Sequence, residues 1–365
     1  MTNSPRLDTS SDRPTTDYAS AGVSVAEGDR AVELMREWVD KARRPEVVGG
    51  IGGFAGLFDA SALKDYTRPL LATSADGVGT KVQIAQRMDV HDTIGFDLVG
   101  MLVDDLVVCG AEPLFMTDYI ACGKVVPERI ADIVKGIAQA CAETGTALLG
   151  GETAEHPGLL GVDEYDIAGS TTGVVEADRL LGPERVRSGD VVVAMAASGL
   201  HSNGYSLVRQ VFFGQAGWSL DRQVPEFSST LGEQLLIPTR LYTLPCLALA
   251  AGVEVHAMSH ITGGGLAANL ARVVPDDVSV VVDRSTWSPQ PIFTMVGELG
   301  GVERPALEQA LNMGVGMIAV VAADAADAAI RLLAEHGVDA WIAGQVGAAS
   351  VHGASGTVTM VNDHP

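Results

Sequence analysis

A carboxylate, two glycines and a lysine lie within one six-residue segment of this chain, Asp76-Gly77-Val78-Gly79-Thr80-Lys81. Glycines let the backbone approach an anion closely, and the lysine supplies positive charge. A carboxylate in such a loop repels a phosphate directly, but it can hold the phosphate through Mg2+. The spacing differs from that of a Walker A loop, Gly-x-x-x-x-Gly-Lys-Ser/Thr. The segment therefore predicts a metal-assisted phosphate site, with a simple Asp-Gly turn as the alternative.

A second segment repeats this design, because Gly150-Gly151-Glu152-Thr153-Ala154-Glu155 follows a short strand expected at 146–149. Open sheets bind their ligands beyond the carboxyl ends of their strands. A tight turn with an exposed Glu152 is the structural alternative. Two such segments in one half of the chain favour a shared ligand site over two unrelated turns.

Three further carboxylates lie on a helix expected from Thr93 to Val108. Asp97 and Asp104 are seven residues apart and share a face, and Asp105 lies about 100° round the helix from Asp104. Carboxylates about 4 Å apart repel by several kcal/mol at an effective dielectric constant near 20. Convergence of Asp97 and Asp105 with Asp76 would thus require a cation, and oxygen ligands favour Mg2+. Solvation on a polar stripe is the other interpretation of these acids.

The second half of the chain contains two polar loops in front of expected helices, at 198–206 and 262–265. The first includes His201 and Ser202, and the second includes three consecutive glycines. Free N–H groups at the start of a helix bind phosphate groups. We interpret the two loops as a site for a phosphorylated substrate, although ordinary helix caps would produce the same pattern.

Strand-like and helix-like hydrophobic patterns alternate along the chain and must position these motifs. Strands are expected at 69–75, 116–121, 146–149, 191–197, 278–282, 315–321 and 340–346, and helices at 31–42, 93–108, 128–144, 205–213, 231–236, 264–273 and 325–336. This alternation predicts an α/β (α+β) fold with sheets flanked by helices. A length of 365 residues favours two domains, with the boundary near 177–189.

Composition narrows the classes of partner. The net charge of −22 disfavours nucleic acid and anionic membrane as main partners, because both would be repelled. No apolar run approaches the roughly 20 residues needed to cross a bilayer, so we expect a soluble, cytoplasmic protein. The four cysteines show no Cys-x-x-Cys spacing and indicate a reduced protein. The first twenty or so residues are rich in Ser, Thr, Asp and Pro and predict a mobile tail.

Together these motifs resemble those of the phosphoribosylformylglycinamidine cyclo-ligase family, the aminoimidazole ribonucleotide synthetases of de novo purine biosynthesis. The resemblance spans roughly residues 21 to 346. It also includes Arg43-Arg44-Pro45-Glu46-Val47 with the glycine loop at 49–56, and the segments 91–95, 110–115, 260–265 and 312–317. It implies two α/β domains, the first of which pairs in a homodimer and binds ATP in a glycine-lined cleft.

The reaction implied by the resemblance is an ATP-dependent ring closure. ATP phosphorylates the formyl amide oxygen of phosphoribosylformylglycinamidine, and the amidine nitrogen then closes the imidazole ring. The products are aminoimidazole ribonucleotide, ADP and phosphate. The implied units are a tail at 1–24, an ATP- and Mg2+-binding dimerisation domain at 25–178, and a substrate-binding domain at 187–365.

Roles for individual residues follow from the same resemblance. The implied catalytic residues are Lys81, Glu152 and His201. The implied metal ligands are Asp76, Asp97, Asp105 and Glu152. The implied nucleotide-binding residues are Gly49, Gly50, Gly52, Gly53, Asp76, Gly77, Gly79, Thr80, Gly150, Gly151 and Thr153. The implied substrate-binding residues are Ser202, Asn203, Gly204, Tyr205, Ser206, Thr262, Gly263, Gly264 and Gly265.

This chain departs from the family pattern in two informative places. Tyr18-Ala19-Ser20-Ala21-Gly22-Val23-Ser24 replaces a common Tyr-Lys-Asp-Ala-Gly-Val-Asp, and Asp104 replaces a common Asn. Two other functions remain open at this stage. A small-molecule kinase of the same fold, of the selenophosphate synthetase or thiamine-phosphate kinase type, would release a stable phosphorylated product. A nucleotide-binding module would bind without turnover.

Overall fold

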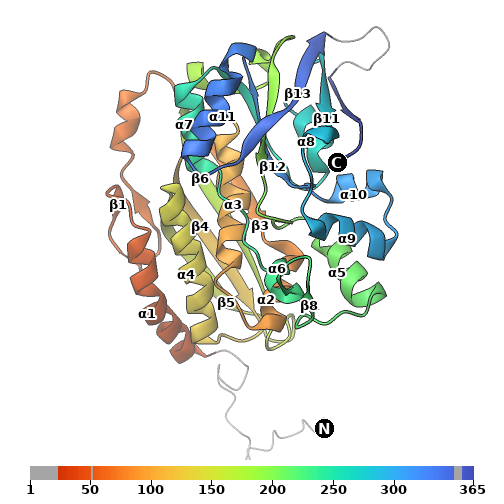
Figure 1. Cartoon of the computed structure of the whole chain (residues 1–365). Helices are drawn as coiled ribbons and strands as arrows, with labels where there is room; N and C mark the ends of the chain where they lie inside the picture. Colours follow the sequence, from red (N-terminus) through yellow and green to blue (C-terminus); the bar gives the residue numbers. More distant parts are fainter. Residues whose placement is uncertain (1–23, 51, 349–355) are drawn as a thin grey trace, which may run out of the picture.

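The computed structural model of the chain describes residues 24–50, 52–348 and 356–365, which form two large sheets flanked by helices and two short two-stranded sheets (Figure 1). The tail expected at 1–24 lies outside the described residues, except for Ser24. The mixed α/β class expected from the sequence is confirmed. No helix within the described ranges is long and apolar enough to cross a membrane.

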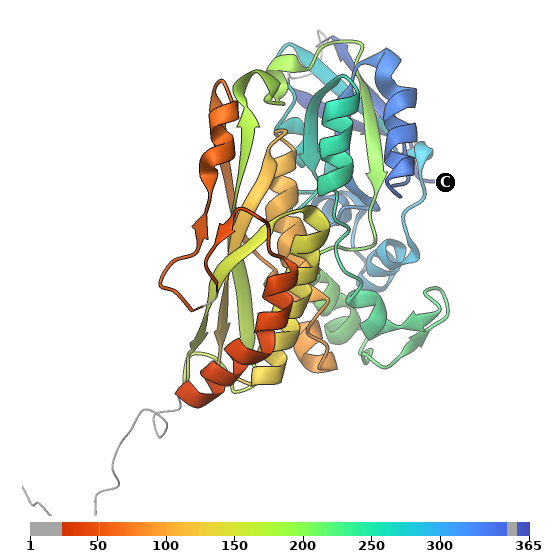
Figure 2. The same cartoon turned by 90° about the vertical axis from the view of Figure 1, so that its left-hand side faces the viewer.

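The first sheet has four strands in the order β3-β6-β4-β5. Its strands are β3 (Pro69–Gly77), β4 (Glu112–Cys122), β5 (Ala147–Glu155) and β6 (Tyr165–Glu176). The pairs β3/β6 and β4/β6 are antiparallel, and β4/β5 is parallel. Its inner face packs against α3 (Ile94–Val107) and α4 (Pro127–Thr144), and α1 (Val25–Lys41) packs on α4 (Figure 2). A small hairpin, β1 (Val47–Val48) and β2 (Leu57–Phe58), precedes the sheet.

The outer face of this sheet carries exposed side chains at alternate positions. Leu71, Thr117, Tyr119, Ala168 and Ser170 are all exposed there. This alternation is typical of an antiparallel sheet with one buried face. These side chains are small, hydroxylated or apolar, and the exposed carboxylates Asp166 and Glu152 lie on the same face.

The second sheet has six strands in the order β10-β12-β7-β13-β11-β14 and is covered on both faces. Its strands are β7 (Val191–Ala196), β10 (Val255–His260), β11 (Val278–Asp283), β12 (Val315–Val321), β13 (Ala340–Ala348) and β14 (Thr357–Val361). One face packs against α7 (Thr243–Gly252) and α11 (Ala326–Glu335), and the other against α8 (Gly265–Ala271). Every residue of β12, which lies between β10 and β7, is buried.

Shorter elements surround the second sheet and the domain junction. They are α2 (Val82–Met88), α5 (Tyr205–Arg209) continued by a π-helical turn (Gln210–Gln215), the short strands β8 (Gln223–Val224) and β9 (Ser229–Thr230), α6 (Leu231–Leu235), α9 (Pro291–Gly300) and α10 (Arg304–Ala310). The strands β6 and β10 were not expected from the sequence. Strand β5 continues to Glu155, so the segment 150–155 lies within a strand and not in a turn beyond its end.

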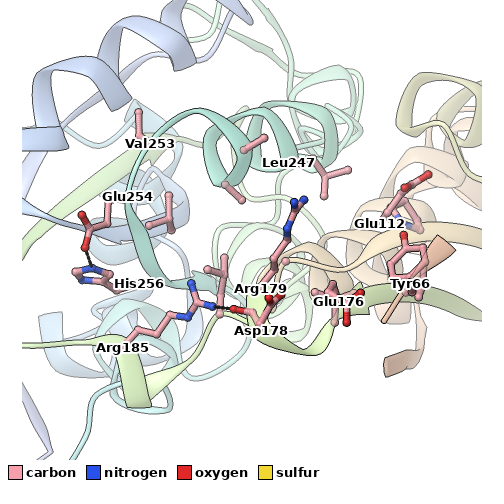
Figure 3. Close-up of a pocket in the computed structure, with 18 of the residues that line it drawn as sticks. Tyr66, Glu112, Glu176, Asp178, Arg179, Arg185, Leu247, Val253, Glu254 and His256 are labelled. Atoms are coloured by element: carbon pink, nitrogen blue, oxygen red, sulfur yellow. Dashed lines mark hydrogen bonds and ion pairs between the residues drawn. The ribbon is translucent and has the colours of Figure 1, made fainter. Parts of the chain in front are cut away.

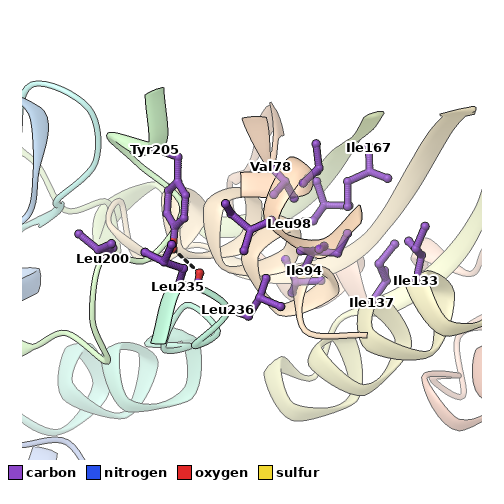
Figure 4. Packing of buried hydrophobic residues seen from close by; sticks show 14 of the residues in the cluster. Val78, Ile94, Leu98, Ile133, Ile137, Ile167, Leu200, Tyr205, Leu235 and Leu236 are labelled. Atoms are coloured by element: carbon purple, nitrogen blue, oxygen red, sulfur yellow. Dashed lines mark hydrogen bonds between the residues drawn. The ribbon is translucent and has the colours of Figure 1, made fainter. Parts of the chain in front are cut away.

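The two halves share one hydrophobic cluster. Val78 and Leu98 from the first half pack in the same cluster as Leu200, Tyr205 and Leu235 from the second (Figure 4). The hydroxyl group of Tyr205 donates a 2.6 Å hydrogen bond to the carbonyl oxygen of Leu235. Because α3 contacts α7 and β10 as well as its own sheet, this helix lies at the centre of the junction.

Candidate active site

Two carboxylates from the first half and an imidazole from the second half meet at the junction. Asp76 lies near the end of β3, Asp105 near the end of α3, and His260 at the end of β10. The Nδ1 atom of His260 lies 3.0 Å from Oδ1 of Asp105. Burial alone lowers the pKa of His260, but the hydrogen bond with Asp105 and the nearby carboxylates reverse this, so its pKa is raised. The imidazole is therefore more readily protonated beside these acids than it would be in water.

The negative charge of Asp76 is only partly compensated by its neighbours. Burial raises its pKa, and the negative charge of Asp105 raises it further, although the N–H of Gly77 and the charge of His260 oppose the shift. Such an environment favours an added cation, and oxygen ligands suit Mg2+. Within the ranges that the structure describes, no group of three or more His, Cys, Asp or Glu side chains is arranged to hold a metal ion.

Lys81 occupies a different position from the one expected for a phosphate ligand. Its side chain is fully buried, and its ammonium group donates to Oδ1 of Asp97 at 2.8 Å and to the carbonyl oxygens of His201 and Ile237. An ammonium group has three N–H donors, and all three have acceptors here. Asp97 is also fully buried, and its charge is balanced by Lys81 within the protein. The structure thus gives both residues partners other than the metal and phosphate expected from the sequence.

Glu152 is also separated from Asp76, the acid with which it was expected to share a metal ion. Asp76 pairs with Gly169, Gly169 with Asp118, and Asp118 with Gly151, so these four positions form one row on the inner face. Glu152 is one residue further along β5 and therefore faces outward with Tyr119. Three strand spacings, about 14 Å, separate its strand from that of Asp76. A single copy of the chain does not bring these two carboxylates together.

Asp118 is a carboxylate near this site that the sequence interpretation missed. Its Oδ1 atom occupies the space that a Cβ atom on Gly151 would need. Although the residue as a whole is only partly buried, burial of its carboxyl group raises the pKa to about 7. The available sequence signal was that Asp118 is a single acid between the apolar residues Met116 and Ile120, which are both buried in the structure.

The loops expected to bind substrate, at 198–206 and 262–265, lie next to the segment 76–81 of the first half. The hydroxyl group of Ser202 donates to the carbonyl oxygen of Val78 at 2.7 Å, and the hydroxyl groups of Thr80 and Ser206 lie 3.3 Å apart. The N–H of Gly263 donates to Oδ1 of Asn203 at 3.1 Å. The loops at 76–81, 198–206 and 262–265 are therefore joined by direct contacts.

Close packing explains the glycines of the substrate loops. Gly204, Gly264 and Gly265 all have positive φ angles, of 74°, 98° and 74°. A Cβ atom on Gly204 would collide with Leu311, and one on Gly265 would collide with the carbonyl oxygen of Glu308. Gly204 and Gly265 are therefore required for both backbone conformation and space, and Gly264 for backbone conformation.

His201 is buried, with 1% of its surface exposed, and has a left-handed backbone with φ of 59°. Burial lowers its pKa well below the usual value, and the positive charges of His260 and Lys81 lower it further. Its Nε2 atom accepts the N–H of Ser198 at 3.2 Å, so the neutral ring carries its proton on Nδ1. That Nδ1 atom has no hydrogen-bond partner among the described residues.

The described residues of the glycine loop at 49–56 are exposed, although Gly56 packs against Leu149. Gly49 and Gly52 have positive φ angles of 89° and 108°, and a Cβ atom on Gly49, Gly50 or Gly52 would meet nothing within 4 Å. The guanidinium group of Arg43 donates to the carbonyl oxygen of Gly49 at 2.6 Å and fixes the start of the loop. Gly49, Gly50 and Gly52 are therefore surrounded by open space.

A large cavity lies elsewhere, between the first sheet, the segment 178–187 and α7 (Figure 3). Its volume is about 1510 Å³, and Tyr66, Glu112, Arg179, Leu247 and His256 are among the residues that line it. None of the residues assigned above to catalysis, nucleotide, metal or substrate lines this cavity. The motif residues and this cavity therefore belong to different regions of the molecule.

Comparison with known proteins identifies the family. Residues 58–175 match the protein family described as "AIR synthase related protein, N-terminal domain". Residues 187–355 match the family described as "AIR synthase related protein, C-terminal domain". The phosphoribosylformylglycinamidine cyclo-ligase of Geobacillus kaustophilus (strain HTA426) is 49% identical over 329 residues, which cover 90% of this chain and 95% of that protein. The corresponding protein of Bacillus cereus (strain Q1) is 45% identical, with 90% and 94% covered. The chain belongs to the phosphoribosylformylglycinamidine cyclo-ligase family. The expectation of an ATP-dependent ligase of purine biosynthesis is thereby confirmed.

Solved structures show how widely the cyclo-ligase fold is shared. Thiamine-monophosphate kinase from Stenotrophomonas maltophilia K279a has a TM-score of 0.66 at 20% identity, with 92% of this chain and 96% of that chain covered. Hydrogenase maturation protein HypE in complex with ATP has a TM-score of 0.64 at 20% identity, with 91% and 90% covered. At such low identity these likenesses concern the fold alone.

Proposed function

We propose that this cyclo-ligase family member converts phosphoribosylformylglycinamidine into aminoimidazole ribonucleotide with release of ADP and phosphate. The observation that carries the proposal is the meeting of Asp76 and Asp105 with His260, next to the joined loops 76–81, 198–206 and 262–265. Residues 25–178 would hold ATP, and residues 187–365 would hold the substrate. The reaction would take place in the cytoplasm.

The chemistry requires a poor leaving group to become a good one. In the proposed first step the formyl amide oxygen attacks the γ-phosphorus of ATP, and the bond to ADP breaks. In the second step the amidine nitrogen attacks the activated carbon, the carbon–oxygen bond breaks, and inorganic phosphate leaves. Phosphoryl transfer of this kind depends mainly on positioning and charge stabilisation.

Mg2+ fits the acidic residues of the first half. Asp76 and Asp105 would hold it, because both supply hard oxygen ligands and the raised pKa of Asp76 reflects incomplete compensation of its charge. When bound, the ion would neutralise phosphate charge during transfer. The glycines at 49–53, 77–79 and 150–151, with Thr80 and Thr153, would surround the nucleotide. Glu152 does not lie with these acids in a single copy of the chain. It would be a ligand only if a second copy of the chain or a rearrangement brought it to ATP.

The substrate would lie against the second half. Ser202 to Ser206 and Thr262 to Gly265 offer hydroxyl and backbone N–H groups on two loops that are already hydrogen-bonded to each other. His201 is the proposed acid–base group, because burial favours its neutral imidazole and its Nδ1 atom has no hydrogen-bond partner within the described part of the chain. With its one proton on Nδ1, the neutral ring would donate a hydrogen bond to the substrate during ring closure, and it would accept a proton only after Nε2 has released the N–H of Ser198.

We also propose that the chain forms a homodimer through the outer face of the first sheet. Leu71 is 64% exposed there, and its neighbours on this face are mainly small or hydroxylated. An exposed large apolar side chain among small neighbours, on a sheet face that no helix covers, supports an interaction surface there. A Leu71→Asp substitution should shift the molar mass measured by light scattering from two chains to one. If the native protein and the Leu71→Asp variant have the same molar mass, this surface does not mediate a dimer.

Product analysis tests the main proposal. Purified protein with Mg2+, ATP and phosphoribosylformylglycinamidine should release ADP and phosphate in equal amounts and form the imidazole product. A stable phosphorylated substrate without free phosphate would instead indicate a small-molecule kinase. Nucleotide binding without ADP formation would indicate a binding module.

A further inference from the structure

The Lys81 ammonium group links three segments that come from both halves of the molecule. Its Nζ atom lies 2.8 Å from Oδ1 of Asp97 on α3, 2.9 Å from the carbonyl oxygen of His201, and 2.7 Å from that of Ile237. Lys81 also directly follows Thr80, which contacts Ser206. One buried side chain thus contacts the loop proposed to bind nucleotide and the loop proposed to bind substrate.

Asp97 extends the same connection. Its Oδ1 atom accepts the backbone N–H of Thr239 at 2.9 Å and the Thr239 hydroxyl group at 2.6 Å. Its Oδ2 atom has no hydrogen-bond partner among the described residues. Through these contacts, α3 holds residues 237–239 of the second half in place. The carbonyl group of Ile237 accepts from Lys81, and the N–H of Thr239 donates to Asp97, so both members of the pair hold this segment.

Such a pair is poorly explained by stability alone. Both side chains have no exposed surface, and burial opposes the charged form of each group. A buried ion pair often contributes less stability than apolar residues of the same volume, because desolvation offsets the attraction. Its distinctive property is fixed geometry, since several hydrogen bonds must be satisfied at once.

We infer that Lys81 and Asp97 are positioning residues that set the His201 loop relative to the 76–80 loop, and that Lys81 does not contact the phosphates. This inference rests on the proposed function for its catalytic consequence. In ring closure, a displaced His201 backbone would misalign the imidazole and the substrate with the activated carbon. A displacement of about 1 Å costs about 10²-fold in rate.

The test uses a double variant, Lys81→Met/Asp97→Asn, which removes both charges and keeps an acceptor for Thr239. We expect kcat to fall by about 10²-fold, while the Kd for Mg-ATP, measured calorimetrically, stays within about threefold. A loss of ATP affinity comparable to the loss of kcat would overturn the inference, because it would place Lys81 on the nucleotide.

A second readout is independent of turnover. Diethyl pyrocarbonate modifies accessible imidazoles, and His201 is buried in the native protein. We expect its modification, mapped by mass spectrometry, to be faster by about tenfold in the double variant, while that of the exposed His336 is unchanged. Full protection of His201 in the variant would contradict a positioning role. If native protein makes no imidazole product, the proposed reaction fails, but the modification result still tests the junction.

Thr239→Val provides the matched control, since it removes one donor to Asp97 without touching Lys81. If Lys81 and Asp97 act through the junction, this variant should show a fall in kcat of about threefold to tenfold, again with little change in the Kd for Mg-ATP. An unchanged kcat would separate Lys81 from the junction and overturn the inference. This milder variant also keeps the test informative if the double variant does not fold.

Discussion

Asp97 and Asp105 lie on the same helix, α3, yet they belong to two regions with opposite physical character. Asp97 has no exposed surface and is paired with Lys81, whereas the side chain of Asp105 is 42% exposed and faces His260. The charge of Asp97 is balanced by the fold itself. Around Asp105 and Asp76, the compensation is incomplete, as the raised pKa of Asp76 indicates. Burial, more than residue type, separates a structural acid from one available to a metal ion.

The second region also shows how a helix can serve both purposes. Asp104, next to Asp105, points into the junction and accepts hydrogen bonds from the N–H of Tyr242 and the hydroxyl group of Thr243. Asp97 and Asp104 therefore hold the segment 239–243, while Asp105 is turned toward the site. A single helix fixes the second half and presents a carboxylate to the proposed metal ion.

Substitution of the junction acid should have the largest effect on stability. Asp97→Ala leaves the Lys81 ammonium group buried without its carboxylate, so we expect the free energy of unfolding to fall by about 3–5 kcal/mol. Urea unfolding followed by circular dichroism measures this loss. Asp105→Ala is the matched control on the same helix. If both variants unfold at the same urea concentration, Asp97 and Asp105 do not differ in their contribution to stability.

The pH dependence of Asp104 offers the next largest effect. Burial raises its pKa to about 6, above the unfolded value of about 3.9. The native state therefore binds this proton more tightly, and the stability it contributes is lost as pH rises from about 4 to about 6. Relative to native protein, Asp104→Asn should gain on the order of 2–3 kcal/mol over that range.

Urea unfolding without Mg2+ at about pH 4.5 and about pH 7.5 checks the Asp104 prediction. Asparagine keeps a carbonyl oxygen for Tyr242 and Thr243, so the comparison isolates the charge. A difference in unfolding free energy that is the same at both pH values would contradict the raised pKa.

Packing around His201 should respond less strongly. A Cβ atom on Gly316 would collide with the Tyr242 hydroxyl group and the His201 ring, so Gly316→Ala should cost about 1–3 kcal/mol of stability. Gly347→Ala is the control in the same sheet, because a Cβ atom there meets nothing within 4 Å. Thermal unfolding of both variants measures the difference. Equal midpoints would show that the ring and the hydroxyl group move aside freely.

Local patterns in the sequence predicted more than the long-range contacts that give them a role. Helical periodicity correctly placed Asp97 and Asp104 on one face of α3, and the strand pattern located the loops at 76–81 and 198–206. The same periodicity cannot reveal that this face meets Thr239, which is 142 residues from Asp97. Nor does a strand pattern give register, which places Glu152 on the face opposite to Asp76. Burial of Lys81 likewise depends on three acceptors that are distant in sequence from one another.

Asp105→Asn should have the smallest effect on stability and thereby sharpen the contrast with Asp97. The side chain is 42% exposed, and asparagine keeps an oxygen beside His260, so we expect a change within about 0.5 kcal/mol in urea unfolding. The use of Mg-ATP should nevertheless weaken strongly, because a neutral amide is a poorer ligand for a hard cation than a carboxylate. The comparison requires the KM for Mg-ATP and the unfolding midpoint of the same protein sample. Parallel losses in both quantities would mean that Asp105, like Asp97, serves the fold; a loss of ATP use alone would leave it as the acid that the helix presents to the metal ion.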